Sequence, residues 1–318
     1  MTFILRDSLE HLLIKVIKNK QGGIELIINY KRSVVKVEEV WSNRKKKLLK
    51  NADISIDTQL LLSPAKEPGL KMFKDSQALE VCVPNYLIDV RKEEDVIYQQ
   101  IHKSTRADIR KAMEKDQLIY SETDNPTNDE ITKFSSFYNS FARRKNIPLC
   151  IIDKLFEIRD HDSLIMTYVK DQQDNLLCAS MLLVDKNHKQ LYGLYGVSAR
   201  LSTNTQKERN LIGRANKFLQ WKEIKLAKKR GMDWYNFGGE VYQTKDKGVN
   251  EFKRRFGTIK GLDRRVYIPN SLLGRIYVFL IYQKWKKNFN TCQTFKYTGS
   301  GVLYLPIIML ESLPLPFI

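Results

Sequence analysis

The stretch LIMTYVKDQQDNLLCASMLLVDKNHKQLYGLYGV, residues 164–197, contains three apolar runs separated by two short polar segments. Apolar runs of this length, bounded by segments rich in Asp and Asn, are typical of short strands joined by hairpin turns. The stretch therefore predicts three consecutive antiparallel strands, over residues 164–169, 176–184 and 191–197.

A helix and further strands are expected after these three strands. Residues 211–230 are predicted to form a long helix that ends at Gly231, because glycine is favoured just past a helix C-terminus. Strands are expected over 232–237 and 259–268, with one or two helical turns at 249–255 between them. Antiparallel strands followed by a helix and further strands indicate a mixed α/β (α+β) fold and not a doubly wound parallel sheet.

The N-terminal part of the chain is expected to form a smaller α/β unit. Its β-branched residues predict a hairpin from 24–30 and 34–40, then two strands, 79–83 and 87–90, separated by Pro84. Thr105 with Asp108 fits a capping box and predicts a helix start there. Apolar spacing predicts a second helix over 129–145.

The charge of the chain limits its partners. Lys and Arg number 54 against 36 Asp and Glu, so the formal net charge is +18. We expect such a protein to bind an anionic partner: nucleic acid, a phosphorylated metabolite or an acidic membrane surface. Four dispersed cysteines and four histidines predict neither a disulfide framework nor a metal site. The N-terminus does not have the pattern of a signal peptide, so we expect a cytoplasmic protein, with peripheral contact at the cytoplasmic membrane face as the alternative.

The segment WYNFGGE, residues 234–240, has two glycines directly after a predicted strand. Glycines there let the backbone turn sharply and present N–H groups to a ligand. In the nearby EFKRRFG, residues 251–257, Lys253 lies between two phenylalanines that could direct its ammonium into a site. A plain strand end followed by a solvated basic helix is the other interpretation. The expected substrate contacts of this cluster are Asn236, Phe237, Gly238, Gly239 and Phe252.

A second cluster of basic residues lies near an expected helix start. Lys103, Arg106 and Arg110 are spaced at three and four residues, which places them on one side of a helix. Guanidinium groups at such a position suit a phosphate or pyrophosphate, and an ordinary solvated face is the alternative.

A third segment, Asn210 to Ala215, partly matches a signature of the GNAT N-acetyltransferases, Gln/Arg-x-x-Gly-x-Gly/Ala. In that superfamily the backbone N–H groups of the signature hold the pyrophosphate of coenzyme A. By this resemblance, Gly213, Arg214 and Ala215 would bind the donor, although a helix start with one glycine also explains the pattern.

Taken together, these segments resemble the Fem-type (FemABX-like) peptidoglycan aminoacyltransferase family and its GNAT-like relatives, over about residues 86–268. The most specific part is Phe-Gly-Gly followed by a glycine and Phe-Lys-x-x-Phe-Gly. The pieces that carry the resemblance are Ile88-Asp89-Val90 with Glu93-Glu94, Ser104 to Ala112, Phe218 to Trp221, Trp234 to Gly239, Gly248, and Phe252 to Gly257.

The resemblance implies two GNAT-like domains with mixed, mainly antiparallel sheets flanked by helices. The first, diverged domain would span 1–120, the acyltransferase domain 121–270, and a C-terminal segment 271–318 would pack on the domains or on a membrane surface. The family moves an acyl or aminoacyl group onto an amine. Acyl-CoA or aminoacyl-tRNA would be the co-substrate, with no permanently bound cofactor, and a nucleotide- or lipid-linked phosphorylated glycan precursor would be the acceptor.

Within that resemblance, Lys253 corresponds to a lysine that stabilises the developing oxyanion. The chain departs from the family in its short first domain and in having no long charged helical hairpin of the kind some members use for tRNA. The donor is therefore open between tRNA and coenzyme A.

The proton acceptor and the wall of the cleft have further candidates. Glu240 and Asp246 are the nearest acids that could take the amine proton, directly or through water. A substrate-assisted path without a protein base is equally compatible. Tyr195 could line the cleft, and packing within the sheet is its alternative role.

The C-terminal segment combines apolar and basic residues. Residues 272–282 are mostly apolar and precede the sequence Lys284-Trp285-Lys286-Lys287. Prolines in the last apolar stretch, 302–318, argue against a spanning helix. An interfacial helix with a Trp/Lys collar and packing against the first domain are the two interpretations. For the whole chain, a CoA-dependent N-acyltransferase acting on a sugar or lipid and a non-catalytic polyanion- or membrane-binding protein are the alternatives to a Fem-like enzyme.

Overall fold

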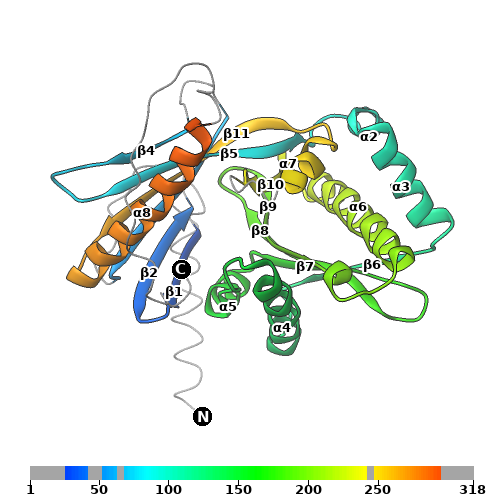
Figure 1. Ribbon diagram of the computed structural model, residues 1–318, viewed down its shortest axis with the longest axis horizontal. Coiled ribbons are helices and arrows are strands. Elements are labelled where there is room, and N and C mark those ends of the chain that lie inside the picture. The colour runs from blue at the N-terminus through cyan, green and yellow to red at the C-terminus, as the bar shows by residue number, and fades with distance from the viewer. Residues whose placement is uncertain (1–25, 42–51, 63–67, 242–246, 295–318) are drawn as a thin grey trace, which may run out of the picture.

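One sheet runs through the whole molecule. The computed structural model describes residues 26–41, 52–62, 68–241 and 247–294. Within these residues the sheet has eleven strands in the order β1-β2-β3-β11-β5-β10-β9-β8-β7-β6, with β4 also paired to β5 (Figure 1). The strands are β1 (Leu26–Arg32), β2 (Val35–Trp41), β3 (Ile54–Leu61), β4 (Gly69–Met72), β5 (Leu79–Asp89), β6 (Ile119–Asp124), β7 (Leu164–Lys170), β8 (Leu176–Asp185), β9 (Gln190–Ser198), β10 (Trp234–Gly239) and β11 (Ile259–Pro269).

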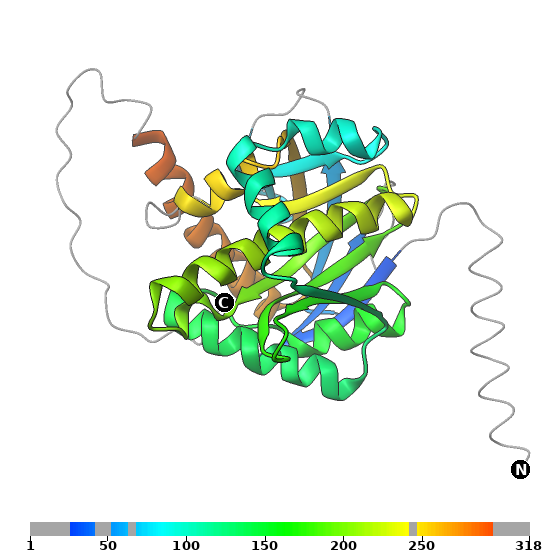
Figure 2. The same ribbon diagram turned by 90° about the vertical axis from the view of Figure 1, so that its right-hand side faces the viewer.

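Helices cover both faces of this sheet and create two apolar cores. Along β8, Cys178 and Leu182 face one core while Ala179 and Met181 face the other, as the alternation of a strand requires. The first core includes α2 (Glu94–Gln100), α3 (Lys103–Glu114) and α6 (Gln206–Lys229). The second includes α4 (Asn128–Lys145), α5 (Ile152–Asp160) and α8 (Leu272–Thr294). Figure 2 shows α3 and α6 over one face, with α4 on the opposite side.

The mixed α/β class with a mainly antiparallel sheet and flanking helices is confirmed. The expected hairpin is β1–β2. The three strands predicted within residues 164–197 are β7, β8 and β9, and they pair in antiparallel order throughout. Among the described strands, only β2–β3 and β9–β10 pair in parallel. The division of the chain at residue 120 stays a prediction. β11 lies between β3 and β5, so strands assigned to the two expected domains alternate within one sheet.

Three expected boundaries are wrong, each for a local physical reason. β5 is one strand through Pro84, which falls between the residues paired with β4 and those paired with β10, so its missing N–H interrupts neither ladder. α3 begins at Lys103 because His102 caps it. α6 begins at Gln206, where the hydroxyl of Thr205 accepts a hydrogen bond from the N–H of Glu208 at 3.2 Å.

Candidate active site

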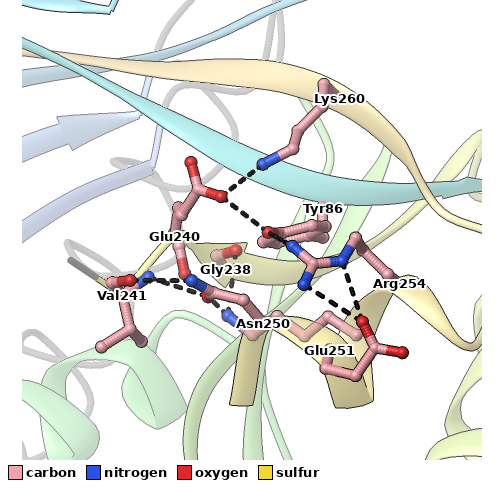
Figure 3. Close-up of polar contacts among 10 residues, drawn as sticks. Tyr86, Gly238, Glu240, Val241, Asn250, Glu251, Arg254 and Lys260 are labelled. Carbon is pink, nitrogen blue, oxygen red and sulfur yellow. Dashed lines mark hydrogen bonds and ion pairs between the residues drawn. The ribbon is translucent and has the colours of Figure 1, made fainter. Parts of the chain in front are cut away.

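Two amide side chains hydrogen-bond the backbone at the end of β10 and fix its conformation. Asn236 is buried, and its Oδ1 accepts a hydrogen bond from the N–H of Gly238 at 2.8 Å. Gly238 has φ of +77°, in the left-handed region that favours glycine. Asn250 of α7 (Lys247–Arg254) exchanges two hydrogen bonds with the backbone of Val241, at 3.0 and 2.7 Å (Figure 3). These bonds bring α7 back over the strand end.

Lys253 of α7 lies against this strand end. Its Nζ donates hydrogen bonds to the carbonyl oxygens of Gly239 at 2.7 Å and Gly238 at 3.3 Å. Burial lowers the pKa of Lys253 to about 8, against the attraction of the Asp263 and Glu240 carboxylates for its proton. An ammonium has three N–H bonds, so within the described part of the chain one is left for a substrate oxygen. The arrangement suits a donor to a developing oxyanion.

The ring of Tyr86 of β5 contacts two ammonium groups, those of Lys253 and Lys260. The Nζ atoms of Lys253 and Lys260 lie 5.5 and 3.9 Å from the centroid of the Tyr86 ring. The Glu240 carboxylate accepts hydrogen bonds from the Tyr86 hydroxyl and from Lys260, each at 2.8 Å, as Figure 3 shows. Although burial opposes it, these two hydrogen bonds hold the pKa of Glu240 below its ordinary value. A carboxylate with a lowered pKa is a weak base, which argues against the proton-accepting role expected for Glu240.

A buried carboxylate lies in the sheet near Lys253. Asp263 of β11 accepts hydrogen bonds from Asn85 Nδ2 at 2.6 Å and from the Tyr192 hydroxyl at 3.2 Å. The same hydroxyl accepts a hydrogen bond from Arg265 Nη2 at 3.1 Å. Burial raises the pKa of Asp263, although Arg265 opposes this. The charge of Asp263 favours the protonated form of Lys253 and so helps to keep the ammonium at neutral pH.

The strands β9 and β10 stop pairing beside this group. Their parallel ladder runs only from Trp234 opposite Gln190 to Asn236 opposite Tyr192. The two glycines of β10 therefore lie past the last residue that is paired with β9.

A cavity of about 380 Å³ lies between α3, α6, α7 and the 3₁₀ turn η1 (Ala199–Leu201). Arg214 pairs with Asp116 at 2.5 and 2.9 Å, and Lys217 pairs with Asp108. The remaining basic side chains of the wall are those of Arg200 and Arg209. The residues that line the cavity are Asp108, Ser198, Arg200, Arg209, Asn210, Ile212, Gly213, Arg214, Asn216, Lys217 and Phe252. Phe252 directly precedes Lys253, so α7 borders both the cavity and the polar group at β10.

The start of α3, which carries Lys103, lies near the end of α7, because the N–H of His102 donates to the carbonyl of Arg255 at 2.8 Å. Arg106 Nη1 donates to the backbone and side-chain oxygens of Gln99, both at 2.8 Å. Lys103 and Arg110 are exposed. A phosphate contact of these residues stays a prediction.

The expected donor segment lies within α6, and a donor contact of its residues stays a prediction. Because α6 begins at Gln206, the N–H groups of Gly213, Arg214 and Ala215 belong to the interior of the helix ladder and cannot hold a pyrophosphate. Gly213 and Arg214 line the cavity instead, and Ala215 is buried.

Tyr195, another predicted site residue, makes its contacts away from Lys253. The Tyr195 hydroxyl accepts a hydrogen bond from the N–H of Ile151 at 3.2 Å, and its ring packs edge-on against Tyr138. A substrate contact of Tyr195 stays a prediction. Asp246 lies outside the described residues. No group of three or more His, Cys, Asp and Glu side chains in residues 26–41, 52–62, 68–241 and 247–294 could hold a metal ion.

The sequence did not indicate Tyr86, Asp263, Arg200 or Arg209. Tyr86 and Asp263 come from the central strands β5 and β11, and only strand pairing brings them beside α7. The role of Asn250 could have been predicted from the sequence. An amide three residues before the motif lysine is well placed to bond the backbone on the N-terminal side of its helix.

Comparison with known proteins agrees with the motifs. Residues 167–260 match the model of the FemAB family, so the resemblance to Fem-type proteins is confirmed over that segment. No curated protein sequence matches the chain significantly.

Several solved structures match this chain at low sequence identity. A crystal structure of FemX is 16% identical, with 67% of this chain and 68% of that chain covered and a TM-score of 0.47. L-PGS from Bacillus licheniformis is 11% identical, with coverages of 83% and 86% and a TM-score of 0.48. N-myristoyltransferase from Saccharomyces cerevisiae with bound myristoyl-CoA is 12% identical, with coverages of 78% and 62% and a TM-score of 0.39. These values indicate nothing about a substrate.

Proposed function

We propose that this chain, which carries a FemAB-family segment over residues 167–260, is an acyltransferase that forms an amide on a cell-envelope glycan precursor. The observation that carries the proposal is Lys253. Its ammonium is held by the carbonyl oxygens of Gly238 and Gly239, within the matched segment, and its pKa is lowered to about 8. At neutral pH such a group is mostly protonated and can donate to an oxyanion.

The proposed reaction joins the amine of the acceptor to the acyl carbon of the donor. The amine nitrogen attacks the carbonyl carbon of an ester or thioester, and the tetrahedral oxygen becomes negative beside Lys253. The C–O or C–S bond then breaks, and the leaving oxygen or sulfur takes the proton that the nitrogen loses, directly or through water or the substrate. Loss of a single oxyanion donor typically lowers the rate about 100–1000-fold.

The cavity beside α7 is the proposed donor site. Arg200 and Arg209 give the wall of the cavity a positive charge. Phe252 lines the cavity and directly precedes Lys253 on α7. A phosphorylated donor could therefore lie against α6 with its acyl end directed past α7. We propose aminoacyl-tRNA as the donor, because the helix interior position of Gly213 removes the backbone cradle on which the coenzyme A alternative was based.

A transfer assay with the full chain tests the proposal. Purified protein is incubated with charged tRNA or acyl-CoA and a nucleotide- or lipid-linked muramyl peptide, and the amide product is measured by mass spectrometry. We expect product with charged tRNA and a loss of about 100–1000-fold for Lys253→Met. The control Lys111→Met, an exposed lysine of α3, should keep full activity.

The assay also distinguishes the alternatives. Product with acyl-CoA alone would identify the CoA-dependent enzyme. Salt-sensitive binding of any polyanion with no product from any donor would identify a non-catalytic binding protein. Arg200→Gln with Arg209→Gln should weaken binding of the true donor and leave acceptor binding unchanged.

A further inference from the structure

α8 is apolar on two sides, and the sheet covers only one of them. Tyr277, Val278 and Ile281 pack into the core on strands of the N-terminal part of the sheet. Gly274 allows a close approach, because a Cβ there would lie 2.0 Å from the carbonyl oxygen of Asp53. These contacts fix which face of the helix points outward. Figure 1 shows α8 lying across the strands near β2 and β4.

The outward face begins with an apolar stripe. Leu272, Ile276 and Phe279 are 74%, 53% and 54% exposed. Their spacing of four and three residues places them in one row along the helix. Single exposed apolar residues are ordinary on protein surfaces, but a row of three large ones on a single helix marks an interaction surface.

Basic side chains continue the same face. Lys286 lies seven residues after Phe279 and is exposed, and Arg275 is exposed beside the stripe. The sequence of α8 contains Arg275, Lys284, Lys286 and Lys287 and no acidic residue. A second copy of the chain would bring this positive face against itself, which disfavours a symmetric dimer. An apolar row with cations beside it is instead typical of a helix lying in the surface of an anionic bilayer.

We propose that α8 docks the protein on a membrane surface that contains anionic lipids. Leu272, Ile276 and Phe279 would enter the boundary of the acyl chains, with Arg275 and Lys286 against the headgroups. None of the helices among the described residues has the length and apolarity to cross a membrane. The proposed contact is one of a helix lying in the surface plane. The expected Trp/Lys collar needs a correction, because Trp285 packs against Phe289 and the core instead of facing outward.

Vesicle flotation of the full chain tests this proposal independently of any transferase activity. The protein is mixed with vesicles of phosphatidylcholine alone or with about one third phosphatidylglycerol, and the fraction that floats gives a partition coefficient. We expect binding to the anionic vesicles only. The double variant Ile276→Ser/Phe279→Ser should lower the partition coefficient about tenfold or more, because each side chain buries apolar area in the bilayer.

Matched controls separate docking from general charge attraction. Ile119→Ser changes an isoleucine of β6 that is 49% exposed, and it should bind as the unchanged protein does. Arg275→Gln/Lys286→Gln should weaken binding more than Lys111→Gln/Lys115→Gln, which removes two exposed charges at the C-terminal end of α3. Circular dichroism of each variant checks that the fold is retained.

Two results would overturn the proposal. One is equal partitioning of the Ile276/Phe279 variant and the unchanged protein, and the other is sedimentation showing a dimer that this variant dissociates while neither form floats.

Discussion

Replacing Lys253 with methionine should separate the catalytic use of this side chain from its effect on stability. The pKa of Lys253 is lowered from 10.5 to about 8, a difference that corresponds to about 3 kcal/mol of destabilisation. Because the side chain is only half-buried, solvent screening reduces this to about 1–2 kcal/mol. Methionine removes that penalty but leaves two carbonyl oxygens without a donor, which costs about 1–2 kcal/mol. At pH 7 the variant should thus differ from the unchanged protein by less than about 1 kcal/mol, while transfer falls about 100–1000-fold.

The lowered pKa of Lys253 also determines in which direction stability changes with pH. Between about pH 8 and 10.5 the unfolded chain binds more protons at this lysine than the folded chain does, so stability rises with pH across that range. Lys253→Met lacks this gain. The stability difference in favour of the unchanged protein should therefore grow by about 1–2 kcal/mol between pH 7 and pH 10.

Urea unfolding at the two pH values measures this difference, with Lys111→Met as the control that should show no comparable change. If the difference in the free energy of unfolding between the Lys253→Met variant and the unchanged protein were the same at both pH values, the burial argument would be refuted. Full transfer by the variant would refute the catalytic one.

Four further changes test other residues of the site and its surroundings. Glu240→Gln removes an acid that raises the pKa of Lys253, so the fall in kcat/KM at alkaline pH should begin about half a pH unit lower; an unchanged profile would contradict the coupling. Asp263→Asn removes a buried carboxylate that accepts hydrogen bonds from Asn85 and Tyr192 and that interacts electrostatically with the buried Arg265. The free energy of unfolding in urea should fall by about 3 kcal/mol, whereas a loss below about 1 kcal/mol would contradict this role of the carboxylate. Gly257→Ala should destabilise by at least about 2 kcal/mol, because φ is +74° and the new Cβ would lie 2.6 Å from a carbonyl oxygen. Gly213→Ala should instead stabilise the protein by about 0.5–1 kcal/mol, because no atom lies within 4 Å of the new Cβ. The added methyl group should also raise the KM for the donor. An unchanged KM would contradict the proposal that the donor binds in this cavity.

The sequence by itself determined the local elements and the motif that forms one side of the candidate site. Apolar runs and turn residues located the meander β7–β8–β9, because strand preference and turn formation depend on a few neighbouring residues. The sequence order Phe-Gly-Gly and Phe-Lys-x-x-Phe-Gly likewise located Lys253 beside Gly238, since only 15 positions of sequence separate the two residues.

Only the tertiary structure decided which distant residues join that motif. Asp263 and Tyr86 belong to strands far apart in sequence, and the pairing of β11 with β5 sets them near the same lysine. No local pattern encodes such pairing, because it depends on which strands become neighbours when apolar faces are buried. Helix starts show the same limit on a smaller scale: the first turn of α6 is polar and lacks the apolar periodicity that reveals a helix, and the cap at Thr205 fixes where it begins.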